Sequence, residues 1–510
     1  MQGTMIKRIA KMIAALGTNM GLNLVVQLLL PPAFLHYYGI KRYGEWLVLS
    51  ATVSYLSTLN FGVTTYASNQ LTMLYKRGEM GEYRRLQGST LAMILCMIGI
   101  GLILISCIFF LPLTTLLHLT TMSRAEATMT AFFLGLLAVS NIFAGYYNNL
   151  FMVVEKAHRG ISWSVARWSI STLICIPLAM IRTPFSVIAI GQFSAALIIA
   201  LLTVWDLKRL MGPLPLGLKG ANWKTAKASL APSGMFAMIF TQQFLLFQAP
   251  VIMLNWILGP EVVVLFTICR TISSTARQVL QTITYAIAPE VTFSFAERDM
   301  KKLLSIYHNS EKVVFSVIPI ANLGAFLASP ILLTIWLHKP QLFDPYVYGL
   351  MALISAAMSM RDHKQFFQFS TNTHKRLSII VFFGNILMIA ASIPFTIKFG
   401  IYGFMFTWLV SEVLQMVLIY HENKRLFRND PSIKFLPILK LWLVMAVSLP
   451  ICMGLVHFGQ RISLTMVGAA AVVGLLLLIV ESYFVFGLKD VWTLLQNKLR
   501  HNHPATTQGA

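Results

Sequence analysis

The 510-residue chain is 57% hydrophobic and 11% charged, with 40 Lys and Arg residues against 18 Asp and Glu residues. This composition, with a mean hydropathy of +0.71, excludes a soluble globular domain and indicates an integral membrane protein. The net charge of +22 is spread over short segments between apolar runs, which indicates membrane topology and not a nucleic-acid partner. The five cysteines show no metal-ligand spacing, so no metal site is predicted.

Fourteen segments are long and apolar enough to cross the hydrocarbon core of a bilayer. They cover residues 9–34, 44–68, 89–111, 128–154, 161–181, 184–205, 229–257, 261–289, 311–337, 346–369, 377–397, 401–421, 435–457 and 464–486. Lysine and arginine are abundant in every second connection, and Lys364, near the end of the tenth span, is counted with Lys375 and Arg376 among the cations of the inner loop that follows. Because cytoplasmic loops carry the positive charge, we predict an all-α polytopic membrane protein with both termini in the cytoplasm.

A basic linker that is rich in glycine and proline, 206–228, divides the spans midway along the chain. We therefore predict an N-terminal lobe of six helices, a C-terminal lobe of six, two further helices and a cytoplasmic tail, at 1–205, 229–422, 423–488 and 489–510 respectively. A weak internal repeat supports this division, since Tyr43-Gly44-Glu45-Trp46 lies at the start of the second span and Leu258-Gly259-Pro260-Glu261 at the start of the eighth. Repeated halves are typical of secondary transporters.

The eighth span carries a polar stripe at spacings of three and four residues. Its members are Thr267, Arg270, Thr271, Ser274, Arg277, Gln278 and Gln281. On an α-helix these positions share one face. An arginine at bilayer depth costs about 3 kcal/mol or more if it faces lipid, so we expect the stripe to face a bundle interior or a water-filled cavity. The structural alternative is that each arginine pairs with a carboxylate on a neighbouring helix.

Polar residues also align on other spans. They are Asn19, Asn23 and Gln27 on the first, Ser50, Ser54 and Ser57 on the second, and Thr407, Ser411 and Gln415 on the twelfth. Each stripe alone fits hydrogen bonding between helices, worth about 1 kcal/mol per contact. The stripes on the first, second and eighth spans together favour a shared hydrated cleft.

Several motifs resemble those of a transporter family. They are Tyr43-Gly44-Glu45-Trp46 through Leu59-Asn60-Phe61-Gly62, Leu258-Gly259-Pro260, Ala288-Pro289-Glu290 and Gly400-Ile401-Tyr402-Gly403. Over residues 8–430 the chain is similar to the polysaccharide-biosynthesis (Wzx-type) flippases of the multidrug/oligosaccharidyl-lipid/polysaccharide exporter (MOP) superfamily. The resemblance implies a V-shaped pair of six-helix bundles around a central cavity. It also implies flipping of an undecaprenyl-pyrophosphate-linked oligosaccharide, an O-antigen or capsule repeat unit, across the bacterial inner membrane by alternating access.

The resemblance further implies membrane lipids and the glycan polymerase machinery as partners, and a proton or sodium gradient as the driving force, with no cofactor. Members of the family often carry Asp where this chain has Asn60. That departure puts ion coupling through this position in doubt.

A lipid pyrophosphate requires cationic hydrogen-bond donors, and the guanidinium fork binds phosphate oxygens in a bidentate manner. Our hypothesis is that Arg277 and Arg167 receive the pyrophosphate from the inner leaflet and that Arg270 holds it farther along. Other candidate substrate-binding residues are Ser274, Asn19, Asn23 and Gln27. The alternative for Arg167 is a side chain that snorkels to the inner headgroups.

Three carboxylates are candidate counter-charges or coupling groups. Glu412 lies within its span, where it either pairs with Arg270 or carries a proton, whereas Asp362 and Glu290 are expected near the inner surface in solvated or gate-pairing roles. The chain has no G-x-x-x-x-G-K-[ST] motif for ATP hydrolysis.

Three rival functions stay open. A membrane glycan polymerase or ligase requires reacting groups in the outer loops, which here are short and poor in carboxylates. A multidrug exporter for organic cations requires an acidic, aromatic pocket. A peptidoglycan lipid precursor flippase shares the chemistry of an anionic lipid substrate.

Overall fold

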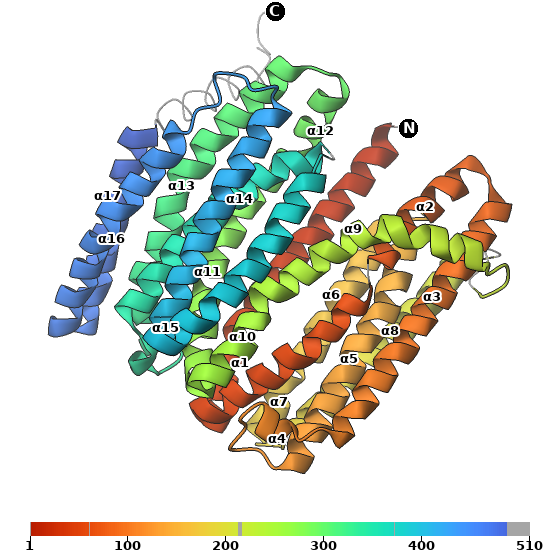
Figure 1. Cartoon of the computed structure of the whole chain (residues 1–510), viewed down its shortest axis with the longest axis horizontal. Coiled ribbons are helices and arrows are strands. Elements are labelled where there is room, and N and C mark those ends of the chain that lie inside the picture. Colours follow the sequence, from red (N-terminus) through yellow and green to blue (C-terminus); the bar gives the residue numbers. More distant parts are fainter. Residues whose placement is uncertain (1, 61, 213–216, 372, 487–510) are drawn as a thin grey trace, which may run out of the picture. The chain divides into compact units, whose positions relative to one another are not determined.

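The computed structural model describes residues 2–60, 62–212, 217–371 and 373–486, and within these ranges the secondary structure is helical with no strand (Figure 1). Eight of the described helices are long and apolar enough to cross a membrane. Each of the fourteen predicted spans falls mainly on helical residues in these ranges. The prediction of an all-α polytopic membrane protein is therefore confirmed. The predicted tail at 489–510 lies outside the described residues.

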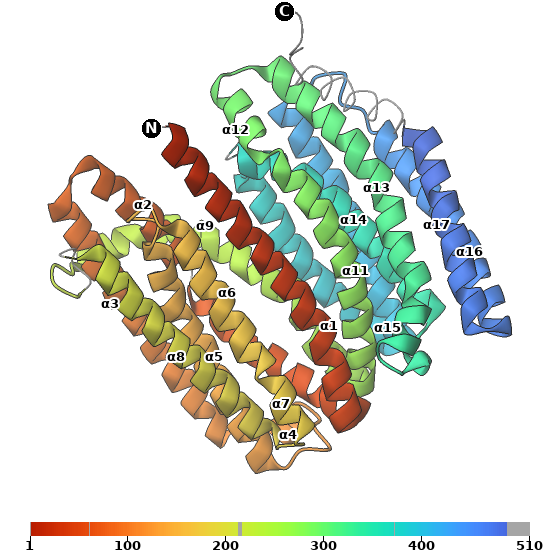
Figure 2. The ribbon, with the colours of Figure 1, turned by 180° about the vertical axis from the view of Figure 1, so that it is seen from behind.

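The first of two compact units comprises residues 1–264. Its elements are α1 (Gln2–Ser54), η1 (Tyr55–Asn60), α2 (Val63–Arg77), α3 (Met80–Cys107), η2 (Ile108–Phe110), α4 (Leu113–Leu116), α5 (Arg124–Leu150), α6 (Ala157–Leu173), α7 (Cys175–Met180), α8 (Phe185–Met211), α9 (Trp223–Phe247), α10 (Ala249–Leu258) and the start of α11 (Pro260–Ala286). α1 holds two predicted spans, because its backbone breaks at Gly39 with a φ of 79°, which glycine adopts readily. α5 packs against α3, α6 and α8 (Figure 2) around the buried rings of Tyr83, Tyr146 and Phe151.

The Tyr43-Gly44-Glu45-Trp46 motif has a packing role in this unit. A Cβ on Gly44 would lie 2.2 Å from the Pro260 carbonyl oxygen, so only glycine fits here. The fully buried Glu45 carboxylate accepts hydrogen bonds from the backbone N–H groups of Thr120 at 2.7 Å and Thr121 at 2.8 Å. The two segments that form the internal repeat thus contact each other, and Glu45 satisfies backbone donors in the turn before α5.

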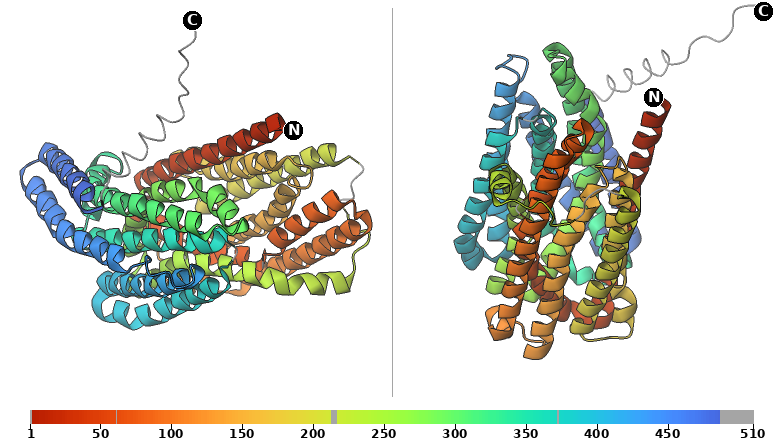
Figure 3. Two further views of the ribbon diagram at one scale, coloured as in Figure 1. Left: turned by 90° about the horizontal axis from the view of Figure 1, so that it is seen from above. Right: turned by 90° about the vertical axis from the view of Figure 1, so that its right-hand side faces the viewer.

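The second unit begins at Leu265. It contains the rest of α11, then α12 (Ala288–Ala296), α13 (Met300–Ile335), η3 (Pro340–Leu342), α14 (Pro345–Ser370), α15 (Lys375–Leu426), α16 (Leu436–Ile462) and α17 (Leu464–Phe486). α15 holds two predicted spans, which meet at Gly400 with a φ of 61°. α14 packs against α13 and α15, and α13 against α16 and α17. Figure 3 shows α16 and α17 side by side along one edge of this unit. α14 is therefore the central helix and is buried over most of its length.

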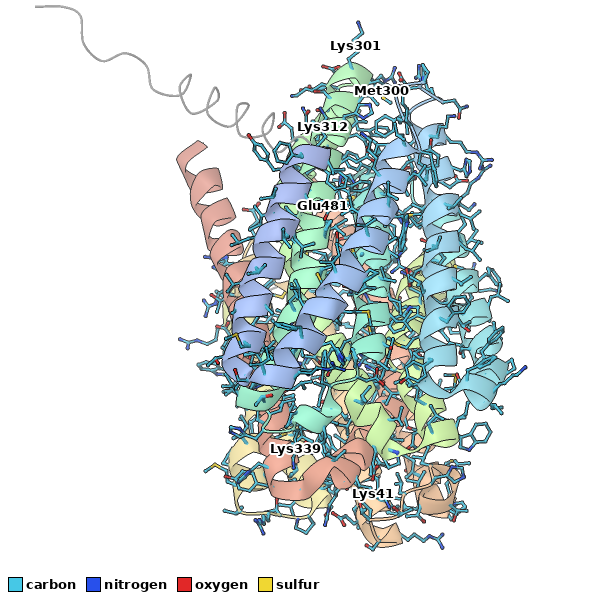
Figure 4. The ribbon with its side chains drawn as sticks, turned by 90° about the vertical axis from the view of Figure 1, so that its left-hand side faces the viewer. Lys41, Met300, Lys301, Lys312, Lys339 and Glu481 are labelled. Atoms are coloured by element: carbon cyan, nitrogen blue, oxygen red, sulfur yellow. The ribbon has the colours of Figure 1, made fainter. Side chains whose placement is uncertain are left out.

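Lysine positions separate the two ends of the second unit. Lys301 and Lys312 lie toward one end of α13, and Lys339 lies beyond the other end (Figure 4). This separation agrees with the predicted alternation of basic and non-basic connections. The assignment of Lys364 to an inner loop was wrong, because α14 includes this residue and its side chain is fully buried. Charge alone does not distinguish a lysine in a loop from one that is paired inside a bundle.

Packing and the sequence repeat divide the chain at different points. In the sequence, the boundary between the compact units falls between Val264 and Leu265. The helices α9 and α10, which the repeat assigns to the C-terminal lobe, pack against α1, α2 and α3. The end of the 206–228 linker is fixed to α3, where the Ser89 hydroxyl accepts from the Asn222 N–H at 2.8 Å and donates to the Asn222 carbonyl at 3.1 Å. The lobe boundaries drawn from the repeat stay a prediction.

Candidate functional site

The polar stripe of the eighth span occupies the partly exposed face of α11. Its seven members are all half-buried: Thr267, Arg270, Thr271, Ser274, Arg277, Gln278 and Gln281. The opposite face is buried and mostly apolar, with Ile268, Ile272, Ala276 and Leu280. Lipid-facing surfaces show the reverse pattern, as on α15, where Phe383, Leu387 and Leu414 are exposed. The open face of α11 therefore suits water or a polar ligand better than lipid.

Side-chain hydrogen bonds join α11 to α14. The Ser355 hydroxyl donates to the Ser273 carbonyl at 3.3 Å, Arg277 Nη1 to Met358 Sδ at 3.3 Å, and Gln281 Nε2 to Asp362 Oδ2 at 2.9 Å. Residue numbers rise together in both helices, so the two run in the same direction, as expected for spans that are two crossings apart. This pairing places Asp362 beside the stripe, one helical turn beyond Met358.

The two stripe arginines lie at this half-buried face. The Arg277 side chain is 15% exposed, and its Nε is 3.7 Å from Asp362 Oδ2, longer than a charged hydrogen bond of about 2.7–2.9 Å. The Arg270 guanidinium carbon lies 5.1 Å from the centre of the Phe266 ring, a cation–π distance. The Ser274 hydroxyl donates to the Thr271 carbonyl at 2.9 Å. Asp362 is thus a counter-charge for Arg277 but lies too far from its Nε for a charged hydrogen bond.

A tighter ion pair lies deeper in the unit. Glu412 on α15 is fully buried, and its Oε2 is 2.7 Å from Arg361 Nη1 on α14. Trp408 Nε1 donates to Glu412 Oε1 at 3.1 Å, and Arg361 Nη1 to Gln415 Oε1 at 3.4 Å. The sequence left Arg270 and a proton as alternative partners of Glu412, whereas the structure pairs it with Arg361. Removing one member of such a pair leaves an uncompensated buried charge, at a cost of about 3–5 kcal/mol.

A second buried cation was also missed in the sequence. Lys364 Nζ lies 2.6 Å from Glu311 Oε1 and donates to the Tyr307 hydroxyl at 2.8 Å. Asn423 Nδ2 on α15 donates to the Lys364 carbonyl at 2.9 Å, so this residue connects α13, α14 and α15. The available signal was the Arg361-Asp362-His363-Lys364 run inside an apolar span, because ionisable groups at that depth must find partners.

The predicted site residues of the first unit lie on two helices, α6 and α1. Arg167 on α6 is 9% exposed and donates a hydrogen bond from Nη1 to Asn141 Oδ1 on α5. The snorkelling alternative, which requires an exposed guanidinium, does not describe this side chain. On α1, Gln27 Nε2 donates to Asn23 Oδ1 at 3.3 Å, and both residues are half-buried. The Asn19 side chain lies outside the described residues.

Glu290 is an exposed residue of α12. Its carboxylate is 2.6 Å from Lys302 Nζ, and this hydrogen bond raises the pKa of Lys302. An exposed pair of this kind is well solvated and contributes little to stability. Among the described residues, no three His, Cys, Asp or Glu side chains lie close enough together to hold a metal ion.

Neither a family model nor a curated protein sequence matches the chain. Among solved structures, it is similar to a multidrug resistance MATE family transporter of the MOP superfamily in an inward-facing conformation, with a TM-score of 0.63 and 13% identity over 81% of this chain and 94% of that one. It is also similar to the lipid II flippase MurJ in an inward closed conformation, with a TM-score of 0.65 and 12% identity over 94% of this chain and 99% of that one. A third is the MATE multidrug transporter DinF-BH, with a TM-score of 0.56 and 17% identity over 84% of this chain and 95% of that one. The chain has the fold of the MOP-superfamily transporters.

The MOP-superfamily fold and the apolar helices together make this chain a multi-pass membrane protein. The same fold carries a lipid II flippase and multidrug transporters, so the side chains have to indicate the substrate. In the second unit the open face of α11 presents Arg270 and Arg277, whereas the Glu412 carboxylate is fully buried behind Arg361. The charged members of the α11 stripe are therefore both positive.

Proposed function

We propose that this chain is a flippase that moves an undecaprenyl-pyrophosphate-linked oligosaccharide, an O-antigen or capsule repeat unit, across the bacterial inner membrane by alternating access. The observation that carries this proposal is the half-buried, cationic face of α11 in a chain with the MOP-superfamily fold. A polar face with two arginines is unfavourable against lipid. It suits an anionic group that has to pass through a medium of low dielectric constant.

The chemistry of the stripe fits a phosphorylated lipid. Arg270 and Arg277 lie seven residues apart on α11, about 10 Å along the helix at 1.5 Å per residue. Each guanidinium donates bidentate hydrogen bonds to phosphate oxygens and keeps its charge when it is half-buried. Two such groups at different depths support a path along which a pyrophosphate passes from one to the next. Ser274, on the same face between them, adds a hydroxyl.

In the first unit, Arg167, Asn23, Gln27 and Asn19 stay candidates for substrate contact. Arg167 already donates to Asn141, so a substrate phosphate would have to compete with an amide oxygen for the guanidinium. A charged acceptor forms the stronger bond with arginine. The same proposal has three further parts. A proton or sodium gradient drives transport, both termini lie in the cytoplasm, and the protein associates with glycan polymerase machinery.

A second candidate function is the flipping of a peptidoglycan lipid precursor, since the chain is similar to the lipid II flippase MurJ over 94% of its length. The positive stripe fits that substrate as well, because it is also an anionic lipid. A multidrug exporter function is favoured by the similarity to MATE structures. However, the positive charge of the stripe repels organic cations, which counts against this function.

The test is to delete the gene and to complement the strain with the wild type, Arg270→Gln, Arg277→Gln and, as a control, Arg85→Gln on the exposed side of α3. We expect deletion to abolish one surface glycan while its lipid-linked unit accumulates inside. The two α11 variants should restore less than a tenth of the glycan at normal membrane abundance, and Arg85→Gln should restore it fully. Cell lysis with accumulated peptidoglycan precursor would identify the second candidate instead. Normal surface glycan in both α11 variants would refute the role of the stripe.

A further inference from the structure

Two arginines and two carboxylates meet where α11, α14 and α15 pack together, and the two carboxylates are held very differently. Glu412 is fully buried and lies 2.7 Å from Arg361 Nη1. Asp362 is 20% exposed and lies at the limit of ion-pair distance from both arginines, with Oδ2 3.7 Å from Arg277 Nε and Oδ1 3.9 Å from Arg361 Nη2. Glu412 is therefore a fixed partner of Arg361, and Asp362 is the loosely held member of the group.

The position of Asp362 is set by a neutral group. Gln281 Nε2 donates to Asp362 Oδ2 at 2.9 Å, a shorter contact than either arginine makes with this carboxylate. Meanwhile Arg277 Nη1 donates to Met358 Sδ at 3.3 Å, and a thioether is a weak acceptor. Asp362 thus compensates the charge of Arg277. One guanidinium nitrogen of Arg277, however, donates to the Met358 thioether, and a phosphate oxygen is a stronger acceptor than that sulfur.

We propose that Asp362 is an exchangeable counter-ion for Arg277, which the phosphate of an anionic ligand displaces on binding. This inference rests on the proposed function of the α11 stripe. In the absence of ligand, Asp362 neutralises Arg277 inside the membrane. When a diphosphate engages Arg277, repulsion between the two anions moves the Asp362 side chain toward Arg361, whose Nη2 already lies 3.9 Å away. When the ligand leaves, the carboxylate returns. Asp362 therefore limits affinity and speeds release, both of which a transporter requires.

The test measures binding to the purified full-length protein in detergent, with inorganic pyrophosphate, undecaprenyl pyrophosphate and uncharged undecaprenol as separate probes. Asp362→Asn removes the competing charge and should tighten binding of both diphosphates about tenfold while it slows their dissociation. Asp362→Glu keeps the charge on a longer side chain that reaches Arg277 directly, and it should weaken binding severalfold. Thr275→Val, whose hydroxyl donates to the helix backbone on α11, is the matched control and should bind as the wild type does.

A purely structural role for Asp362 predicts weaker or equal binding in both variants, so opposite changes are the distinguishing result. Unchanged affinity in Asp362→Asn and Asp362→Glu, with binding lost in Arg277→Gln, would overturn the exchange and leave the proposed function standing. If Asp362→Asn does not fold, Asp362→Ser, which also removes the charge, takes its place with the same expected tightening, and unchanged or weaker binding refutes the proposal. A wild type that binds neither diphosphate overturns both. If the protein binds undecaprenyl pyrophosphate but not inorganic pyrophosphate, the lipid is identified as the source of the phosphate.

Discussion

The Lys364–Glu311 pair offers the sharpest energetic test of how the second unit is held together. At the 2.6 Å distance between Nζ and Oε1, two unit charges attract by about 6 kcal/mol at an effective dielectric constant of about 20. Desolvation of both groups offsets most of this, since each fully buried ion costs several kcal/mol. The pair therefore contributes little net stability, but either charge left alone should destabilise the unit by about 3–5 kcal/mol.

We expect Lys364→Met and Glu311→Leu each to show this loss, and the double variant to lie within about 1 kcal/mol of the wild type. Lys364→Met also deprives the Tyr307 hydroxyl of its donor, which places it at the upper end of the range. The assay is unfolding in mixed dodecyl maltoside and SDS micelles, followed by tryptophan fluorescence. Lys302→Met, which removes an exposed lysine paired with Glu290, is the control and should leave the midpoint unchanged. Strictly additive losses in the double variant would refute the reasoning.

Three further predictions concern backbone positions and the motif of the first unit. Gly44→Ala places a Cβ 2.2 Å from the Pro260 carbonyl oxygen, so it should cost about 3 kcal/mol, measured as a lower melting temperature of the purified protein; an unchanged melting temperature would contradict this packing. Gly400→Ala forces a side chain onto a backbone at φ 61° and ψ −147°, which should destabilise the protein by about 2 kcal/mol and lower its melting temperature. Gly454→Ala, where a Cβ meets open space, is the control and should leave the melting temperature unchanged. Glu45→Gln weakens the charged hydrogen bonds to the turn before α5 by about 2 kcal/mol, and faster backbone hydrogen exchange at 118–122 should report it; native-like protection there would disprove the role of the carboxylate.

The helical organisation was readable from the sequence because it depends on local chemistry. Apolar runs of sufficient length indicate spans, and polar residues at spacings of three and four share one helix face whatever the helix packs against. For this reason the sequence predicts the α11 stripe without reference to the helices that surround it. The importance of Gly44 was visible as a motif, but its reason, the close approach of Pro260, depends on two segments more than 200 residues apart.

Partner choice among the charges was decided only in three dimensions. The sequence alone determined that this chain is a polytopic helical membrane protein and that its eighth span carries a cationic face. Only the tertiary structure showed that Glu412 is paired with Arg361, that Lys364 is buried against Glu311, and that Asp362 stands near Arg277 without a direct hydrogen bond. The physical reason is that the charges of an ion pair interact over a few ångströms of space, whereas these partners are separated by 51, 53 and 85 positions along the chain, a separation that no local pattern encodes.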